Sequence, residues 1–161
     1  MTEQKTNVMR TLEQKKIAYT AHFYPHGDEA VDGITAAALI GKRPEEVSKT
    51  RVTRGAGGGI YVFVIPVAEE LDLKKAAKAV KEKSVAMIPV RDINAVTGYI
   101  RGGCSPVGMK KSYPTVFDAS VLELETVTVS AGKIGCQVEA KPEDLMALTR
   151  ASAADLTVKG G

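Results

Sequence analysis

Residues 49–65, KTRVTRGAGGGIYVFVI, decide the fold, because two runs typical of strands flank one glycine-rich turn. Lys49 to Thr53 suits a strand, and Ile60 to Ile65 is an almost unbroken apolar run of the kind found in buried strands. The segment from Gly55 to Gly59 is glycine in four of its five positions, which favours a flexible turn. The stretch therefore predicts a β-hairpin whose second strand is buried.

Outward from this hairpin, short helices and short strands are interleaved along the chain. Helices are expected at 7–16 with Asn7 as the cap, at 35–40 ended by Gly41, after the cap Asp72, at 92–97 ended by Gly98, and from Pro142 onward. Strands are expected at 19–24, 84–88, 99–101, 115–118, 126–130 and 136–139, with a turn at 131–135. Helices and strands do not alternate strictly, so we expect an α+β fold: one domain over residues 1–161, with a mixed, mostly antiparallel sheet or barrel and packed helices.

Composition places the chain among ordinary globular proteins, with 161 residues, 44% apolar and 25% charged. The net charge of +3 permits an anionic partner without demanding one. No stretch approaches the ~18 apolar residues of a membrane span, and the N-terminus has no apolar signal core. Cys104 and Cys136 are far apart in sequence and make no disulfide framework. We expect a cytoplasmic protein with no membrane partner.

Most common catalytic signatures are absent. Gly55 to Gly59 is not followed by the Gly-Lys-Ser/Thr of a phosphate-binding loop, and it joins two strands. Ser105 does not fit the nucleophile elbow, because Val107 stands where that pattern needs glycine. His22 and His26 lie between strand and loop, where their spacing does not converge on a metal. We expect no metal and no cofactor, while a role for His22 as a general base stays open.

Two features have both a structural and a functional interpretation. Residues 98–108 contain four glycines and a proline, and such a segment either makes a tight turn or lets the backbone approach a ligand closely. Residues 130–133 form a second turn of this kind. Lys49 is either a solvated lysine or one whose ammonium is desolvated and faces a substrate carbonyl or phosphate.

Three segments together resemble the YbaK/EbsC family of aminoacyl-tRNA deacylases, which is related to the editing domain of bacterial prolyl-tRNA synthetases. They are VSKT at 47–50, TGYIRGGCSPVGMKK at 97–111 and VSAGKIG at 129–135. Pro66-Val67 and the helix after Asp72 support the resemblance, which covers nearly the whole chain in order. The segment around Gly102-Gly103 is specific, whereas the Lys49-Thr50 pair alone would be weak.

The resemblance implies a site and a reaction. The family's essential lysine falls on Lys49, and its substrate-binding positions fall on Tyr24, Thr50, the Gly102-Gly103 turn and Ser130. The implied reaction is trans-editing of mischarged Cys-tRNA(Pro) with no metal and no protein nucleophile. The substrate's own thiol attacks the ester, and the cysteine leaves as a thiolactone. We therefore predict that neither cysteine of the chain is a nucleophile.

One departure from the family bears on specificity. Many relatives carry a Phe-Gly pair where this chain has Val31-Asp32-Gly33, so an aromatic wall of the pocket is expected to be missing. Two alternatives stay open: a water-based deacylase for another amino acid such as alanine or serine, or a non-catalytic module that binds tRNA or a synthetase. Prolyl-tRNA synthetase is a candidate partner. Two basic groups are candidates for contact with RNA phosphates: Lys110-Lys111, and the helix stripe of Lys74, Lys78 and Lys81, which is either such a contact or a plain solvated face.

Overall fold

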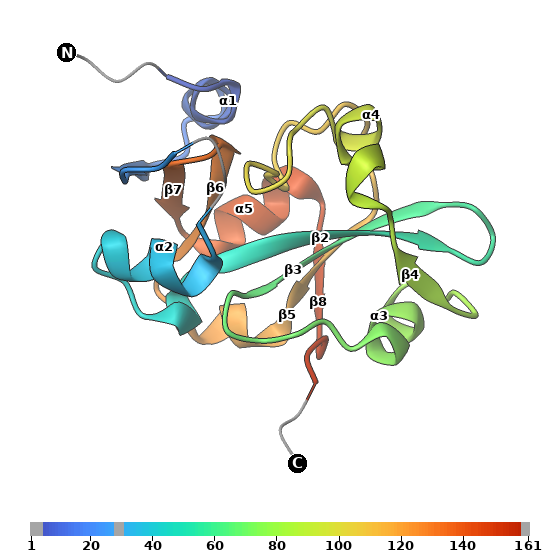
Figure 1. Cartoon of the computed structure of the whole chain (residues 1–161). Helices are drawn as coiled ribbons and strands as arrows, with labels where there is room; N and C mark the ends of the chain where they lie inside the picture. The colour runs from blue at the N-terminus through green and yellow to red at the C-terminus, as the bar shows by residue number, and fades with distance from the viewer. Residues whose placement is uncertain (1–4, 28–30, 159–161) are drawn as a thin grey trace.

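The computed structural model describes residues 5–27 and 31–158, and its strands form two sheets (Figure 1). The larger sheet has the order β4-β2-β3-β5-β8, and the smaller has the order β1-β7-β6. Four strand pairs are antiparallel, and two, β3 with β5 and β5 with β8, are parallel. The predicted α+β fold with a mixed, mostly antiparallel sheet is confirmed, and of the two alternatives, sheet or barrel, the open sheet is correct.

The strands have these bounds: β1 Tyr19–Phe23, β2 Ser48–Gly55, β3 Ile60–Pro66, β4 Val85–Met87, β5 Thr115–Asp118, β6 Val127–Lys133, β7 Cys136–Ala140 and β8 Ser152–Ala154. The α-helices are α1 Asn7–Gln14, α2 Gly33–Leu39, α3 Leu73–Ala79, α4 Ile93–Thr97 and α5 Pro142–Thr149. Three short 3₁₀ turns complete the elements: η1 Pro44–Glu46, η2 Val90–Asp92 and η3 Ala119–Glu123. No helix among the described residues is long and apolar enough to cross a membrane.

The hairpin predicted from residues 49–65 is the centre of the larger sheet. β2 and β3 pair antiparallel from Ser48 opposite Pro66 to Arg54 opposite Ile60. Its turn is closed by the Gly55 amide, which donates to the Gly59 carbonyl at 2.8 Å, and Gly58 has a φ of +95° that favours glycine. Phe63 and Ile65 of β3 are fully buried, as an apolar run in a central strand requires.

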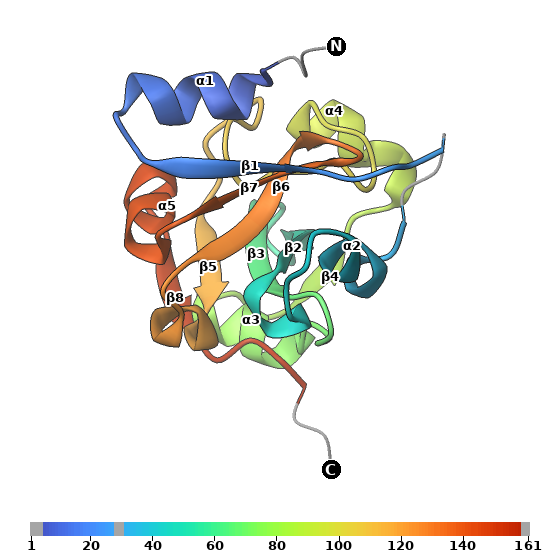
Figure 2. The same cartoon turned by 90° about the vertical axis from the view of Figure 1, so that its left-hand side faces the viewer.

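Two hydrophobic clusters lie on different sides of the molecule. α1 places Val8, Met9 and Leu12 in one cluster with apolar residues of β6 and β7. α3 places Ala76 and Ala77 against Phe63 and Ile65 in the other. Figure 2 shows α1 beside β1 at the opposite end of the molecule from α3. The first cluster also contains Val64 of β3 and Phe117 of β5, so it joins the two sheets.

Several predicted boundaries are wrong for local reasons. Residues 99–101 form a turn and no strand, because positive φ angles at Gly98 and Gly102 bend the chain on both sides. The side chain of Thr6, and not that of Asn7, caps α1 by accepting from the Met9 amide at 3.2 Å. β6 continues through a bulge to Lys133, so the turn predicted at 131–135 is shorter. β8 was not predicted.

Candidate active site

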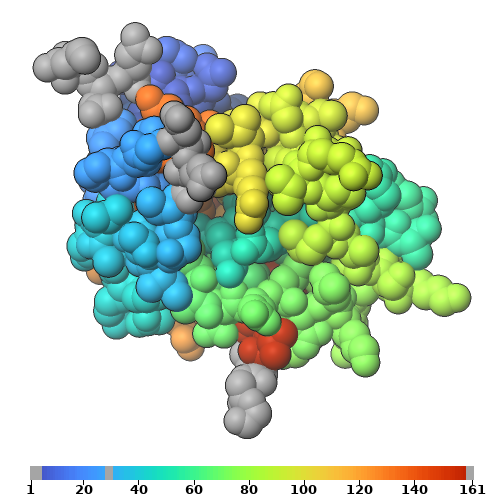
Figure 3. Space-filling view, viewed as in Figure 1, coloured from blue at the N-terminus to red at the C-terminus, as the bar shows by residue number. Residues whose placement is uncertain are grey.

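A cavity of about 780 Å³ lies where β2, β6, β7, the start of α2 and the loop after α4 meet. Figure 3 shows this loop, in yellow near residue 100, overhanging β2 in teal, with α2 in blue beside it. Its lining residues are Tyr24, Val31, Asp32, Gly33, Ile34, Ala36, Ser48, Lys49, Thr50, Arg51, Val67, Ile100, Arg101, Gly102, Cys104, Ser130, Ile134 and Gln137. Five of the six predicted site residues are therefore brought together from four separate parts of the chain.

Lys49 is the second residue of β2 and is half-buried in the cavity wall. The strand ladder opposite Ile65 holds its backbone, and its Nζ donates to the Val67 carbonyl at 3.1 Å. Burial, and then the charge of Arg51, lower the pKa of Lys49 below its ordinary value, while Glu70 and Glu69 act in the opposite direction. Because an ammonium has three donors, it can hold a substrate oxygen as well as Val67. The desolvated interpretation of Lys49 is the one that the structure supports.

Tyr24, Thr50, Ser130 and Gly102 surround the same cavity. The Tyr24 amide donates to the Gly135 carbonyl at 3.0 Å, which ties the segment after β1 to the turn between β6 and β7. The Ser130 Oγ accepts from the Gly132 amide at 3.1 Å, so its hydroxyl proton is available for another acceptor. These contacts fix polar groups around a space of the size that commonly binds small-molecule ligands.

Gly103 stands apart from the other predicted residues, because it does not line the cavity. A Cβ at this position would lie 3.0 Å from the Lys133 Cα and 3.2 Å from the Ile134 nitrogen. The absence of a side chain thus lets the loop after α4 pack directly on the turn between β6 and β7. Of the Gly102-Gly103 pair, Gly102 faces the cavity and Gly103 seats the loop.

The sequence profile of the aminoacyl-tRNA editing domain matches residues 28–148, three quarters of the chain. The chain belongs to this family. EbsC of Enterococcus faecalis, provisionally named a Cys-tRNA(Pro)/Cys-tRNA(Cys) deacylase, is 43% identical over 158 residues, which cover 98% of this chain and 96% of EbsC. The resemblance inferred from the sequence is confirmed.

Two solved structures with similar sequences have the same fold. One, described provisionally as a trans-editing enzyme for prolyl-tRNA synthetase, superposes with a TM-score of 0.81 at 26% identity, covering 94% of this chain and 95% of that one. A scaffold protein used for computational epitope grafting superposes with a TM-score of 0.84 at 28% identity, covering 95% of this chain and 96% of the scaffold. Family membership makes the cavity around Lys49 the candidate editing site.

The wall expected to lack an aromatic residue is aliphatic. Val31 and Ile34 line the cavity on either side of Asp32, whose carboxylate caps α2 by accepting from the Thr35 amide at 2.8 Å. Gly33 has no room for a side chain, because an added Cβ would lie 2.6 Å from two carbon atoms of Val67. The start of α2 is therefore seated against Val67, and its apolar side chains shape this part of the pocket.

Among the cavity residues that the sequence patterns did not single out are Arg51, Arg101 and Gln137. Arg51 follows Lys49 by two positions, so strand alternation was the signal that places both on one side of β2. Gln137 is opposite Ser130 in the register of β6 and β7, which no sequence pattern reveals. Gln137 is 8% exposed, and its Oε1 has no hydrogen-bond partner among the described residues. A buried acceptor of this kind is suited to a polar group of a ligand.

Neither Cys104 nor His22 fits a role as nucleophile or base. Cys104 lines the cavity, but burial raises the pKa of its thiol to about 11, so it stays protonated near neutral pH. His22 lies outside the lining, with its Nε2 2.8 Å from Glu139 Oε1. Within residues 5–27 and 31–158, no group of three or more His, Cys, Asp or Glu side chains is arranged to hold a metal ion.

Proposed function

We propose that this chain is a trans-editing deacylase that removes cysteine from mischarged Cys-tRNA(Pro) in the cytoplasm. The observation that carries the proposal is the desolvated Lys49 ammonium in a cavity that also presents Ser130, Tyr24 and Gly102. The relative EbsC bears the name of a deacylase of Cys-tRNA(Pro) and Cys-tRNA(Cys), and a structural relative is described in connection with prolyl-tRNA synthetase. That synthetase is the partner we propose for delivering the substrate.

In the proposed reaction the substrate supplies its own nucleophile. The cysteinyl thiol gives up its proton and its sulfur attacks the ester carbonyl, so negative charge develops on the carbonyl oxygen. The C–O bond to the ribose then breaks, the 3′ oxygen takes up the proton that the thiol released, and cysteine thiolactone leaves for hydrolysis in water. Lys49 stabilises the developing oxyanion, and the cavity walls hold thiol and carbonyl in reacting geometry. The protonated Cys104 is consistent with a mechanism without a protein nucleophile.

A panel of charged tRNAs tests the activity. We expect rapid deacylation of Cys-tRNA(Pro), and slower deacylation of Ala-tRNA and Ser-tRNA, which have no thiol. Comparable rates for alanine or serine would replace the thiol mechanism by attack of a bound water. Binding of these tRNAs without release of any amino acid would identify a non-catalytic module.

Replacing the cysteinyl group by 2-aminobutyryl tests the mechanism, because a methyl group then stands where the sulfhydryl was. Cleavage should nearly stop, while binding changes by only about 1–3 kcal/mol, the value typical of one small group in a pocket. Thiolactone should appear before free cysteine in the parent reaction, and its release would class the first step as a lyase reaction. Rapid cleavage of the 2-aminobutyryl ester would refute thiol attack and leave a hydrolase. The Cys104→Ala variant, expected to remain active, serves as the control for a protein nucleophile.

A further inference from the structure

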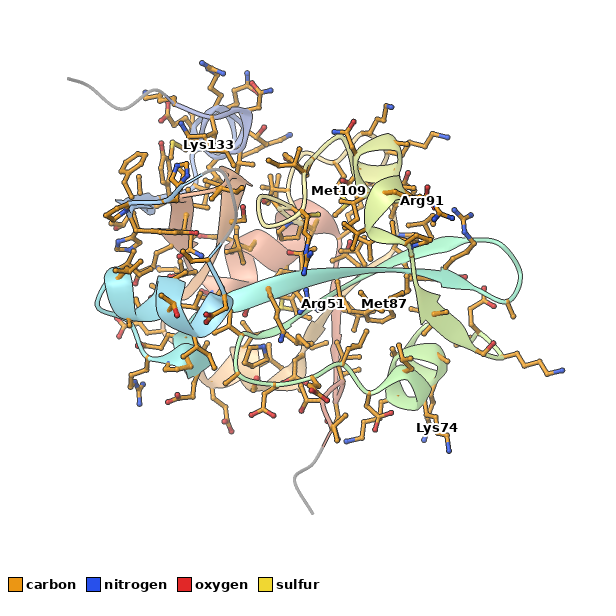
Figure 4. All side chains as sticks on the ribbon, viewed as in Figure 1. Arg51, Lys74, Met87, Arg91, Met109 and Lys133 are labelled. Atoms are coloured by element: carbon orange, nitrogen blue, oxygen red, sulfur yellow. The ribbon has the colours of Figure 1, made fainter. Side chains whose placement is uncertain are left out.

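Two arginines share the cavity with Lys49. Arg51 is half-buried on β2, two residues after Lys49, and Arg101 is exposed on the loop that overhangs it. Figure 4 shows Arg51 on the middle of β2, below the loop that carries Met109 in this view. Side chains two positions apart on a strand are about 7 Å apart and point to the same side. The cavity therefore has three cationic groups. Asp32 also lines it, but its carboxylate accepts from the Thr35 amide and hydroxyl and is in no ion pair of the described residues.

Among the described residues, these arginines have no counter-ion. Over the part of the chain that the structure describes, six ion pairs are formed, and none includes Lys49, Arg51 or Arg101. Neither guanidinium donates a side-chain hydrogen bond to any described residue, whereas Arg54 on the same strand donates to Gly58 O at 3.3 Å. Burial, and then the charge of Arg101, lower the pKa of Arg51 below its ordinary value. A half-buried, unpaired cation beside two others is unfavourable unless a ligand compensates it.

The missing charge is that of an anion, and the chemistry of an aminoacyl ester limits which anion it is. The ester itself carries no negative charge, and its α-ammonium is repelled by cations. The nearest anion on an aminoacyl-tRNA is the phosphodiester on the 5′ side of the terminal adenosine, one ribose away from the ester. The spacing of Lys49 and Arg51 along β2 is of this order. Planar guanidinium groups bind phosphate oxygens in pairs, which suits this position.

We propose that Arg51 and Arg101 form an anion subsite that binds the phosphodiester of the 3′-terminal nucleotide while Lys49 contacts the ester. This inference rests on the proposed function, since it takes the aminoacyl end of tRNA as the substrate. The ribose is then held between Lys49 at the ester and the arginines at the phosphodiester. The subsite therefore positions the scissile ester and takes no part in the chemical step. It also makes aminoacyl esters that lack a phosphate poorer substrates.

The test compares two small substrates, 3′-O-cysteinyl adenosine and the same ester with a 5′-phosphate. The parent should prefer the phosphorylated ester by about 10-fold or more in kcat/KM, as expected for one charge-assisted hydrogen-bonded pair. Arg51→Leu and Arg101→Leu should each bring this ratio toward one. Arg54→Leu is the matched control, because it removes the same charge from the same strand outside the cavity lining and should keep the ratio. Inorganic phosphate should compete with the phosphorylated ester in the parent and in Arg54→Leu, and less in the two cavity variants.

A binding measurement keeps this inference separate from the proposed function. Calorimetry with adenosine 5′-monophosphate and with adenosine needs no turnover, and the parent should prefer the monophosphate by a factor that Arg51→Leu and Arg101→Leu abolish. If the parent cleaves neither ester but shows this Arg-dependent preference, the proposed reaction is wrong and the subsite stands. A preference that survives in both variants, or a parent without any preference, overturns the subsite whatever the activity.

Thermal unfolding supplies a further readout. Replacing an arginine that stabilises the fold would lower the melting temperature. Replacing an unpaired, half-buried cation leaves no partner without its hydrogen bond or counter-ion. Arg51→Leu should therefore melt at or above the temperature of the parent. A drop of several degrees would assign Arg51 to the fold and contradict a ligand subsite.

Discussion

β2 and the loop of residues 98–108 face the same cavity, but different forces hold them. β2 is paired along its length with β3 and, from Thr53 onward, with β4. The loop is paired with no strand in the described structure and is closed by its own contacts. Tyr99 Oη donates to the Val107 carbonyl at 2.5 Å, and the Lys110 amide donates to the Thr97 carbonyl at 2.9 Å.

Because of this difference, we expect side-chain changes on β2 to affect the reaction alone, and changes in the loop to affect the fold as well. Ladder hydrogen bonds fix the backbone of β2 whatever its side chains are, so a side chain such as Lys49 can be replaced with little effect on the fold. The loop depends on close packing at Gly103, so a change there should affect stability and activity together. The predictions below test this contrast, from the largest expected effect to the smallest.

Lys49→Ala should abolish deacylation and leave the fold intact. Loss of one group that stabilises the developing oxyanion raises the barrier by about 3–4 kcal/mol, which is roughly a 10²- to 10³-fold loss of kcat. Single-turnover deacylation and thermal unfolding measure the two effects. Lys83→Ala, which removes an exposed lysine far from the cavity lining, is the control. A Lys49→Ala protein with turnover within a few-fold of the parent would refute the role of Lys49.

An ion cluster around Glu139 links β7 to the residues that follow α2. Its carboxylate lies 2.8 Å from Lys42 Nζ, which follows α2, and also bonds His22 and the Thr126 hydroxyl. Burial alone would raise the pKa of Glu139, but hydrogen bonds from Lys42, Thr126 and His22 outweigh it and lower that pKa to about 2.

Because the pKa of Glu139 is lowered, its ionised carboxylate stabilises the fold at pH values above the ordinary pKa of 4.5. This stabilisation is lost as the pH falls from 4.5 to about 2. The contribution is about 3 kcal/mol near neutral pH. Glu139→Gln should remove most of it, together with the acid-dependent loss of stability over that range. Urea unfolding at pH 7 and pH 3 measures both changes. Glu125→Gln, at an exposed position before β6, should behave as the parent does, and equal losses in the two variants would contradict the role of the cluster.

Gly103→Ala should lower both stability and activity. The new Cβ would be 3.0 Å from the Lys133 Cα, so the loop or the turn has to shift, at a cost of about 1–3 kcal/mol. Denaturant unfolding and kcat/KM measure the paired loss. Gly27→Ala is the control, because a Cβ there meets nothing within 4 Å. Full activity in a destabilised Gly103→Ala protein would mean that the loop position does not matter for catalysis.

The smallest effect is expected at Lys110 and Lys111, both exposed at the end of the loop. Reversing both charges to glutamate should raise the KM for charged tRNA by about 2- to 5-fold and flatten its salt dependence. The matched pair is Lys74 and Lys78 of α3. Figure 4 places Lys74 on the opposite side of β2 from Met109, so this pair should have less effect. Unchanged KM in the loop variant would indicate that RNA binds elsewhere or through a partner.

Sequence patterns predicted the elements whose causes are local. The hairpin of β2 and β3, the cap Asp72 and the left-handed ends at Gly41 and Gly98 are confirmed. Residues 99–101 were wrongly predicted as a strand, because an aromatic and a β-branched residue favour a strand only when a partner strand is present. β8 escaped prediction for the converse reason, since its pairing with β5 creates a strand from Ser152–Ala154.

For the site, the sequence by itself determined the family and, through it, Lys49, Tyr24, Thr50, Gly102 and Ser130 as neighbours. Only the tertiary structure decided that Gly103 packs behind the wall and that Gln137 lies buried opposite Ser130. It also decided that Arg51 and Arg101 line one cavity with no counter-ion among the described residues. The physical reason is that motifs record which residue types a segment contains. Desolvation, strand register and the absence of a charge partner depend on what other segments bring to the same place.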